Sequence, residues 1–140
     1  MNDRHKYRVW DKQKQSFIDN FVIYPDGTFA IFDFRFHEYT NPLSEDDGYI
    51  IEQCTGLTDK NGKLIYEKDI VRVHWTDQKT TDFIVRWNSV QCCFDFDEYR
   101  NKRRGCKFLK WQLLFAFGKS EVVEVIGNIH EMEVENASKM

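Results

Sequence analysis

A basic tract at residues 100–110 carries the most chemically suggestive side chains of this 140-residue chain. Its cationic residues are Arg100, Lys102, Arg103, Arg104, Lys107 and Lys110. Guanidinium and ammonium groups bind phosphates, and neighbouring aromatic rings can stack on bases. The tract is therefore a candidate nucleic-acid-binding site. The interpretation we favour is a solvated hairpin loop whose charges offset the acidic residues just before it.

Three carboxylates precede the tract, at Asp95, Asp97 and Glu98. Hard divalent cations prefer oxygen ligands, so these residues could serve a metal-dependent nuclease. Asp95 and Asp97 would share one face of a strand, but any half-exposed strand offers that spacing. We favour a polar outer face and predict no catalytic or metal-binding residues.

The cysteine and histidine residues lack the spacing of known site types. Cys54, Cys92, Cys93 and Cys106 form no Cys-x-x-Cys pair, and none has a His at zinc-ligand spacing. We expect reduced thiols in a cytosolic protein. His74 and His130 are expected in strands, as packing or edge residues. Since no nucleophile motif or phosphate-binding loop occurs either, we predict no enzyme activity and no cofactor.

Composition favours a folded domain without a strong attraction to polyanions. Hydrophobic residues make up 41% and aromatic residues 16%, which is enough apolar surface for a core. The formal net charge of -3 means that a basic patch would act against the overall field. No apolar run approaches membrane-spanning length, and residues 1–6 lack a signal-peptide core. We expect a cytoplasmic protein with no membrane association.

Alternation of apolar and polar side chains predicts short antiparallel strands. Residues 24–27, Tyr-Pro-Asp-Gly, are a turn signal between the apolar runs 17–24 and 28–36. In the second run Ala30, Phe32, Phe34 and Phe36 would share one face. Further strands are expected at residues 7–10, 49–54, 64–66, 70–75, 83–87, 91–99 and 121–130. Residues 108–117 fit either a strand or a buried helix, and their aromatic content favours a strand.

Together these elements predict an all-β fold, a sandwich or small SH3-like barrel. The loop at residues 41–48 is the expected boundary between an N-terminal part and the rest of the chain. We predict a β-rich N-terminal hairpin region at residues 1–46, packed on a barrel-like region at 47–132, and a flexible tail at 133–140. Open sheets have edges that need covering, which suggests a homo-oligomer.

Three segments resemble the YopX family, at residues 7–11, 55–71 and 125–131. The middle segment is the most specific, Thr-Gly-Leu-Thr-Asp-Lys-Asn-Gly-Lys-Leu-Ile-Tyr-Glu-Lys-Asp-Ile-Val. Order and spacing match across nearly the whole chain. The family is encoded mainly by temperate phages and prophages and has no established molecular role. The resemblance implies a mostly β protein whose C-terminal part is a small barrel-like unit.

The middle segment is dominated by turn residues, which favours a structural role. Gly56 and Gly62 allow tight turns, and Asp59 can cap its own turn through its side chain. Lys68 stands where the family usually has Gly. That implies a backbone position with positive φ, which costs a lysine on the order of 1 kcal/mol.

We therefore expect a phage or prophage accessory protein, a non-enzymatic interaction module that binds an unknown host or phage protein. Nucleic-acid binding through residues 100–110 is the alternative, and a metal-dependent nuclease is a third hypothesis. Fold resemblance alone assigns none of these activities.

Overall fold

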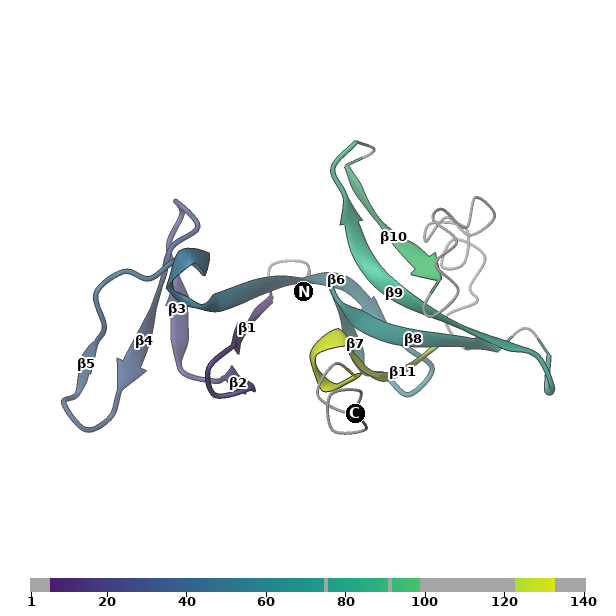
Figure 1. Ribbon diagram of the computed structural model, residues 1–140, viewed down its shortest axis with the longest axis horizontal. Helices are drawn as coiled ribbons and strands as arrows, with labels where there is room; N and C mark the ends of the chain where they lie inside the picture. The colour runs from purple at the N-terminus through teal and green to yellow at the C-terminus, as the bar shows by residue number, and fades with distance from the viewer. Residues whose placement is uncertain (1–5, 75, 91, 99–122, 133–140) are drawn as a thin grey trace. The chain divides into compact units, whose positions relative to one another are not determined.

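The computed structural model describes residues 6–74, 76–90, 92–98 and 123–132. They form mainly antiparallel sheets, which confirms the all-β prediction (Figure 1). The basic tract, the segment 108–117, Cys106 and the tail 133–140 lie outside the described residues. In the described part of the chain, no helix is long and apolar enough to cross a membrane.

The chain divides into two compact units. The N-terminal unit is Tyr7–Glu52, and the C-terminal unit comprises Met1–Lys6 and Gln53–Met140. The chain passes from the first to the second inside one long strand, β6 (Tyr49–Thr58). The division at residues 46/47 that the sequence suggested stays a prediction.

The N-terminal unit consists of short strands joined by tight turns. In chain order these are β1 (Tyr7–Asp11), β2 (Ser16–Ile18), β3 (Phe21–Ile23), β4 (Phe29–Asp33) and β5 (Glu38–Tyr39). β1 pairs with β2, and the other three form an antiparallel sheet in the order β3-β4-β5. A short 3-10 helix, Glu45–Asp47, follows and precedes β6. Its buried apolar residues are Val9, Trp10, Phe29 and Ala30.

The predicted hairpin around residues 24–27 is confirmed, with two corrections. The amide of Gly27 donates to the Tyr24 carbonyl at 2.9 Å, and β3 and β4 pair across this turn. The first apolar run is split, because residues 16–18 pair with β1 instead. The second run ends at Asp33, whose carboxylate accepts the amide of Arg35 at 2.9 Å and starts a turn. Placing Phe34 on a continuing strand face was therefore wrong.

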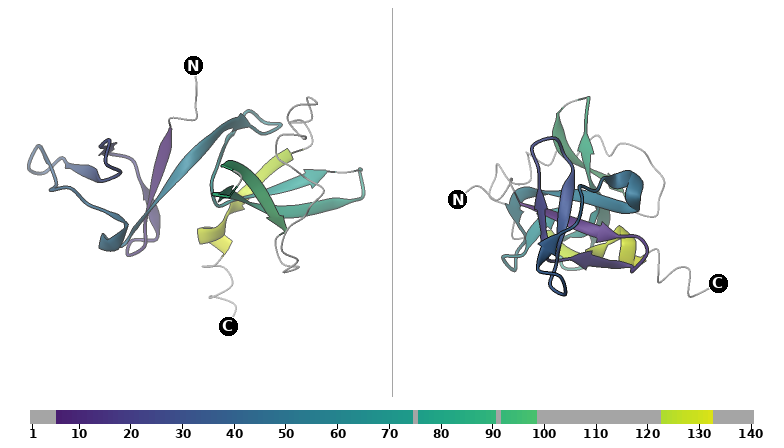
Figure 2. Two further views of the ribbon diagram at one scale, coloured as in Figure 1. Left: turned by 90° about the horizontal axis from the view of Figure 1, so that it is seen from above. Right: turned by 90° about the vertical axis from the view of Figure 1, so that its left-hand side faces the viewer.

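The C-terminal unit contains a four-stranded sheet that curls into a half-barrel (Figures 1 and 2). Its strand order is β10 (Cys93–Glu98), β9 (Thr80–Asn88), β8 (Asp69–His74) and β11 (Val123–Asn128). The later part of β6 pairs with β7 (Leu64–Tyr66). Alternate side chains point to one face, as the sequence pattern requires. They form a core of Ile65, Val71, Val73, Phe83, Val85, Phe96 and Val123.

Asp59 caps its turn as predicted and also reaches a distant strand. One carboxylate oxygen accepts the amides of Asn61 at 2.8 Å and Lys63 at 2.9 Å. The other accepts the amide of Val125 in β11 at 2.9 Å. Burial raises the pKa of this carboxyl, but the amides of Val125, Lys63 and Asn61 outweigh burial, and the pKa lies below its usual value.

Lys68 adopts the left-handed conformation that the resemblance implied. Its φ is 66°. Its amide donates to the Val85 carbonyl at 2.7 Å, and its carbonyl accepts the amide of Ile129 at 2.9 Å. The turn is thus tied to β9 on one side and to the end of β11 on the other, which holds the strained backbone in place.

The last predicted strand is too long at its C-terminal end. β11 stops at Asn128, and residues 129–132 form one helical turn. The Asn128 side-chain oxygen accepts the amide of Glu131 at 3.0 Å, as a helix cap does. His130 was expected in a strand and instead lies buried in this turn. His74 lies in β8, as predicted, with Nε2 3.0 Å from Glu124 Oε2.

Candidate interaction site

The predicted carboxylates of β10 belong to an ion-paired outer face. Arg86 of β9 lies directly across from Asp95. Its Nε is 2.6 Å from an oxygen of Asp95 and 3.2 Å from one of Asp97. Asn88 donates a further hydrogen bond to Asp95 at 2.9 Å. The hydrogen bond with Asp95 raises the pKa of Arg86, against the effect of its partial burial. A guanidinium therefore occupies the place that a bound cation would need.

Glu98 is placed only by its backbone, opposite Phe83 at the end of the β9–β10 pairing. Over the described ranges, no three His, Cys, Asp or Glu side chains gather as a metal-binding group would. Within the described ranges, Cys54, Cys92 and Cys93 form no disulfide, and the Cys54 sulfur accepts the amide of Gly56 at 3.4 Å. The geometry around β10 thus matches the polar outer face that the spacing suggested.

A second group of charges covers the same outer face near β8 and β11. Glu124 lies 3.0 Å from His74 and 3.3 Å from the Lys60 ammonium. Hydrogen bonds from His74 and Lys60 hold the pKa of Glu124 below its usual value. Next to them Arg72 pairs with Asp82 at 2.9 Å. Such partly exposed pairs each contribute roughly 0–1 kcal/mol, and they show a charged, solvated surface rather than a binding site.

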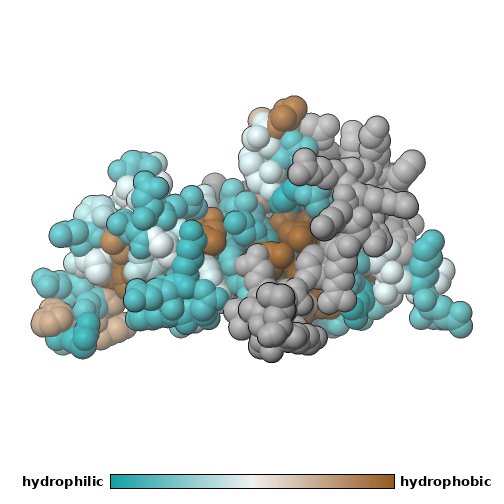
Figure 3. Space-filling view, in the orientation of Figure 1, coloured by the Kyte–Doolittle hydropathy of each residue, from teal (hydrophilic) through white to brown (hydrophobic). Residues whose placement is uncertain are grey.

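The N-terminal unit exposes a cluster of aromatic side chains. Phe34, Phe36 and Tyr39 are 61%, 67% and 50% exposed, although they lie within six residues of one another. The Phe32 ring makes edge contacts with Phe34 at 4.8 Å and with Tyr39 at 5.1 Å. We call Phe32, Phe34, Phe36 and Tyr39 the aromatic hairpin surface. Figure 3 shows hydrophobic atoms at this end of the unit, over the turn between β4 and β5.

The turn that presents these rings is held by Asp33 and Arg35. The Arg35 guanidinium binds the Asp33 carboxylate through contacts of 3.3 and 3.2 Å. These side-chain hydrogen bonds, with the Arg35 amide, hold the pKa of Asp33 below its usual value. The same guanidinium lies 5.6 Å from the centre of the Phe36 ring. A charged pair therefore stabilises the turn that presents the exposed rings.

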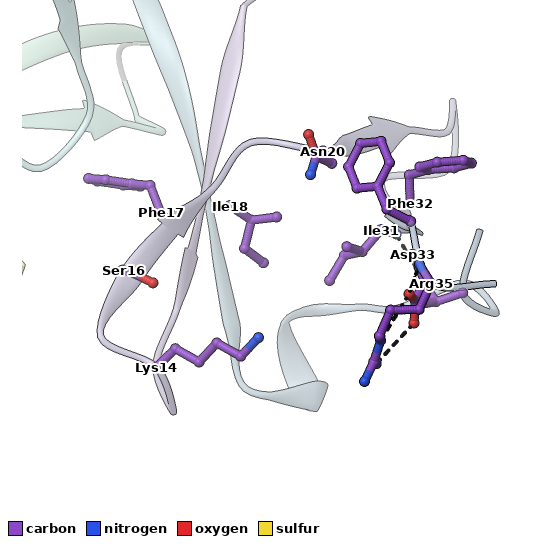
Figure 4. Close-up of a pocket in the computed structure, with 11 residues that line it drawn as sticks. Lys14, Ser16, Phe17, Ile18, Asn20, Ile31, Phe32, Asp33 and Arg35 are labelled. Atoms are coloured by element: carbon purple, nitrogen blue, oxygen red, sulfur yellow. Dashed lines mark hydrogen bonds and ion pairs between the residues drawn. The ribbon is translucent and has the colours of Figure 1, made fainter. Parts of the chain in front are cut away.

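A pocket of about 480 Å³ adjoins this surface, between β2 and β4. Ile18 and Ile31 point toward one another across it, and Lys14 also lines it (Figure 4). Ser16, Phe32 and Arg35 also line it. We call this the β2–β4 pocket. Polar and apolar side chains line it in nearly equal number, so a ligand there would meet both kinds of group.

Buried hydrogen bonds position the β2 wall of the pocket. The carboxylate of Asp11 is 6% exposed and accepts the amides of Gln13 at 2.9 Å and Lys14 at 3.1 Å, which fixes the turn that carries Lys14. In β1, Arg8 binds the fully buried Glu52 at 2.9 Å. On the opposite wall, the hydroxyl of Thr40 accepts the amide of Ile31 at 3.1 Å. Hydrogen bonds thus hold the backbone of both walls.

Neither feature was predicted from the sequence. The aromatic hairpin surface has one usable signal, because an Asp two residues before an Arg can end a strand through its side chain and turn the following Phe outward. The pocket has no such signal, because its walls come from β2 and β4, and local sequence patterns do not predict how these two strands are arranged.

Comparison with known proteins gives a family and two similar folds. The family model described as YopX protein matches residues 6–133. The crystal structure of protein EF1440 from Enterococcus faecalis is similar, with 21% identity, a TM-score of 0.55, and coverage of 91% of this chain and 94% of that chain. The crystal structure of protein yopX from Bacillus subtilis has 17% identity, a TM-score of 0.50, and coverage of 94% and 95%. No curated protein matches the chain.

Proposed function

This chain belongs to the YopX family, and from that premise we propose that it is a non-enzymatic interaction module that binds a protein partner through the aromatic hairpin surface. The family resemblance further supports a phage or prophage accessory protein that works in the cytoplasm of a bacterial host. The partner is then a host or phage protein.

The exposure of Phe34, Phe36 and Tyr39 carries this proposal. Single exposed apolar residues are ordinary, but three exposed aromatic residues within one short hairpin are characteristic of an interaction surface. Aromatic side chains also dominate the binding energy of protein interfaces. The edge contacts of Phe32 and the Asp33–Arg35 pair keep the rings in place before binding, which lowers the entropy cost of association.

The charge of the N-terminal unit indicates what kind of partner binds there. Residues 7–52 contain nine Asp and Glu against four Lys and Arg. This excess repels nucleic-acid phosphates, and it also disfavours pairing of the surface with its own copy. The aromatic hairpin surface therefore suits a different protein better than nucleic acid or a second copy of the chain. The predicted homo-oligomer would have to use other parts of the chain, and sedimentation analysis of the purified protein tests it.

Photo-crosslinking in the bacterial host tests the proposal. A photoreactive amino acid at position 36 is expected to capture a defined protein, whereas one at Val90, an exposed residue of the other unit, is not. The captured protein is then purified and titrated with the wild-type chain, Phe36→Ser and the matched control Val90→Ser. We expect Phe36→Ser to weaken binding roughly 30-fold, the effect of a typical hot-spot residue. Equal affinities for all three proteins would refute the proposal.

Nucleic-acid binding by the basic tract is a second candidate, with one observation in its favour. Arg86 already neutralises Asp95 and Asp97, so residues 100–110 are not needed to offset those two carboxylates. Titration of fluorescent single-stranded and duplex DNA at low salt tests this function. Arg103→Ala with Arg104→Ala is expected to weaken binding and to reduce the salt dependence by about 0.7–0.9 per lost phosphate contact. Arg35→Ala is the control, and an unchanged affinity of the double variant would rule the function out.

A further inference from the structure

We propose that the β2–β4 pocket receives a carboxylate and a neighbouring aliphatic side chain from the partner of the proposed function. The inference rests on that function and adds the chemistry of the segment that is recognised. An acidic residue of the partner would bind Lys14, and an aliphatic side chain beside it would lie between Ile18 and Ile31.

The size and walls of the pocket support the aliphatic part. A volume of about 480 Å³ falls within the range of ordinary ligand sites and suits a short peptide segment. Ile18 and Ile31 face each other across the pocket, and their side chains remain partly exposed (Figure 4). An apolar side chain placed between them would remove three apolar surfaces from water at once, which favours binding.

The charges of the lining residues support the acidic part. Lys14 and Arg35 are the cations among the residues that line the pocket, and Asp33 is their one acid. Asp33 already binds Arg35 through its side chain. None of the other lining residues supplies such an acid for Lys14, which lines the same pocket as Ile18 and Ile31 (Figure 4). A carboxylate at that point would form a charge-assisted hydrogen bond with the Lys14 ammonium.

Other occupants fit less well. A free phosphate or nucleotide would use Lys14 but would leave the isoleucine walls exposed. A second copy of the chain would bring the same acidic excess into contact with itself. These occupants are outcomes that the experiment below separates.

Selection of displayed random heptapeptides on the purified full chain tests the inference. Three proteins are compared, namely wild type, Lys14→Glu and Lys12→Glu. Lys12 lies in the same turn but does not line the pocket, so it is a matched control for net charge. Wild type and Lys12→Glu are expected to enrich an acidic residue at a fixed offset from an aliphatic one. Lys14→Glu is expected to enrich Lys or Arg at that offset.

Affinity measurements complete the test. A peptide enriched on wild type is expected to bind Lys14→Glu roughly tenfold more weakly or worse, and to bind Lys12→Glu as it binds wild type. Excess inorganic phosphate should compete poorly. The inference is overturned by the absence of enrichment, by an acidic preference that persists in Lys14→Glu, or by efficient competition from phosphate. Because the proposed function is tested at Phe36 with the natural partner, a partner that needs Phe36 but not Lys14 would reject this inference alone.

Discussion

Asp59 joins two parts of the C-terminal unit that are 66 positions apart in sequence, the turn after β6 and the strand β11. Its carboxylate is 5% exposed and accepts three backbone amides. An amide side chain cannot reproduce this pattern, because one of its two ends is a donor. The residue therefore has a structural role large enough to be measured.

We expect Asp59→Asn to lower the free energy of unfolding by about 1.5–3 kcal/mol at neutral pH, the range for hydrogen bonds to charged groups. Because the folded pKa is depressed, the wild-type contribution is present above the ordinary pKa of about 3.9 and is lost as the pH falls through the folded pKa. Urea denaturation between pH 7 and 3 should therefore show the two proteins converging at acid pH.

Asp26→Asn is the control for this prediction. Asp26 also accepts hydrogen bonds, from Thr28, but it is exposed and caps only its own turn. Its substitution should have a clearly smaller effect than that of Asp59. An equal effect would show that local turn capping, and not the link to β11, explains the role of Asp59.

Lys68 offers a stabilising change at a single residue. Lys68→Gly removes the side-chain clash of the left-handed backbone and should raise the free energy of unfolding by about 1 kcal/mol. Lys68→Ala keeps the Cβ atom and should gain little. Thermal and urea unfolding measure both, and a destabilised Lys68→Gly would mean that the lysine side chain makes a favourable contact that exceeds the strain.

At the scale of strands, β9 shows where the core ends. Phe83 is 1% exposed and packs on Phe96 with ring centres 5.4 Å apart, whereas Trp87 on the same strand is 45% exposed. We expect Phe83→Ala to cost about 3–5 kcal/mol and Trp87→Ala much less. The denaturation midpoints of the two variants measure these losses. Similar losses would mean that the core extends along β9 as far as Trp87.

Sequence alone predicted the strands whose side chains alternate, because that alternation is the direct consequence of burying one face. It placed β8, β9, β10 and the β3–β4 hairpin close to their observed positions. It failed where a side chain ends an element. Asp33 stops β4 and Asn128 stops β11, each through one hydrogen bond to a nearby amide. A periodic pattern continues past such a residue, so the strand ends were placed too late.

The candidate site was less accessible to sequence analysis. Charge runs pointed to Asp95 and Asp97, which Arg86 pairs across the hairpin. The pairing follows from strand register, which the alternation pattern alone does not fix for these residues. The β2–β4 pocket depends on two strands that are not neighbours in any sheet. Such a site becomes visible only after the elements are assembled.

At the scale of the whole molecule, each unit has a core of its own. Phe29 is fully buried in the N-terminal unit and makes an edge contact with Tyr49 at 5.1 Å. We expect Phe29→Ala to cost about 3–5 kcal/mol and to unfold this unit before the other. Methyl NMR signals of Val9 should then be lost at a denaturant concentration at which those of Val73 and Val85 persist. Simultaneous loss would mean that the two cores fold as one.

The amide of Cys54 donates to the carbonyl of Lys6 at 2.9 Å, so the segments that flank the N-terminal unit are joined to one another. The two ends of residues 7–52 therefore lie next to one another. A unit whose two ends lie close together can be replaced with little disturbance of the remaining fold. We therefore expect that residues 7–52 can be exchanged between related proteins that keep the same half-barrel.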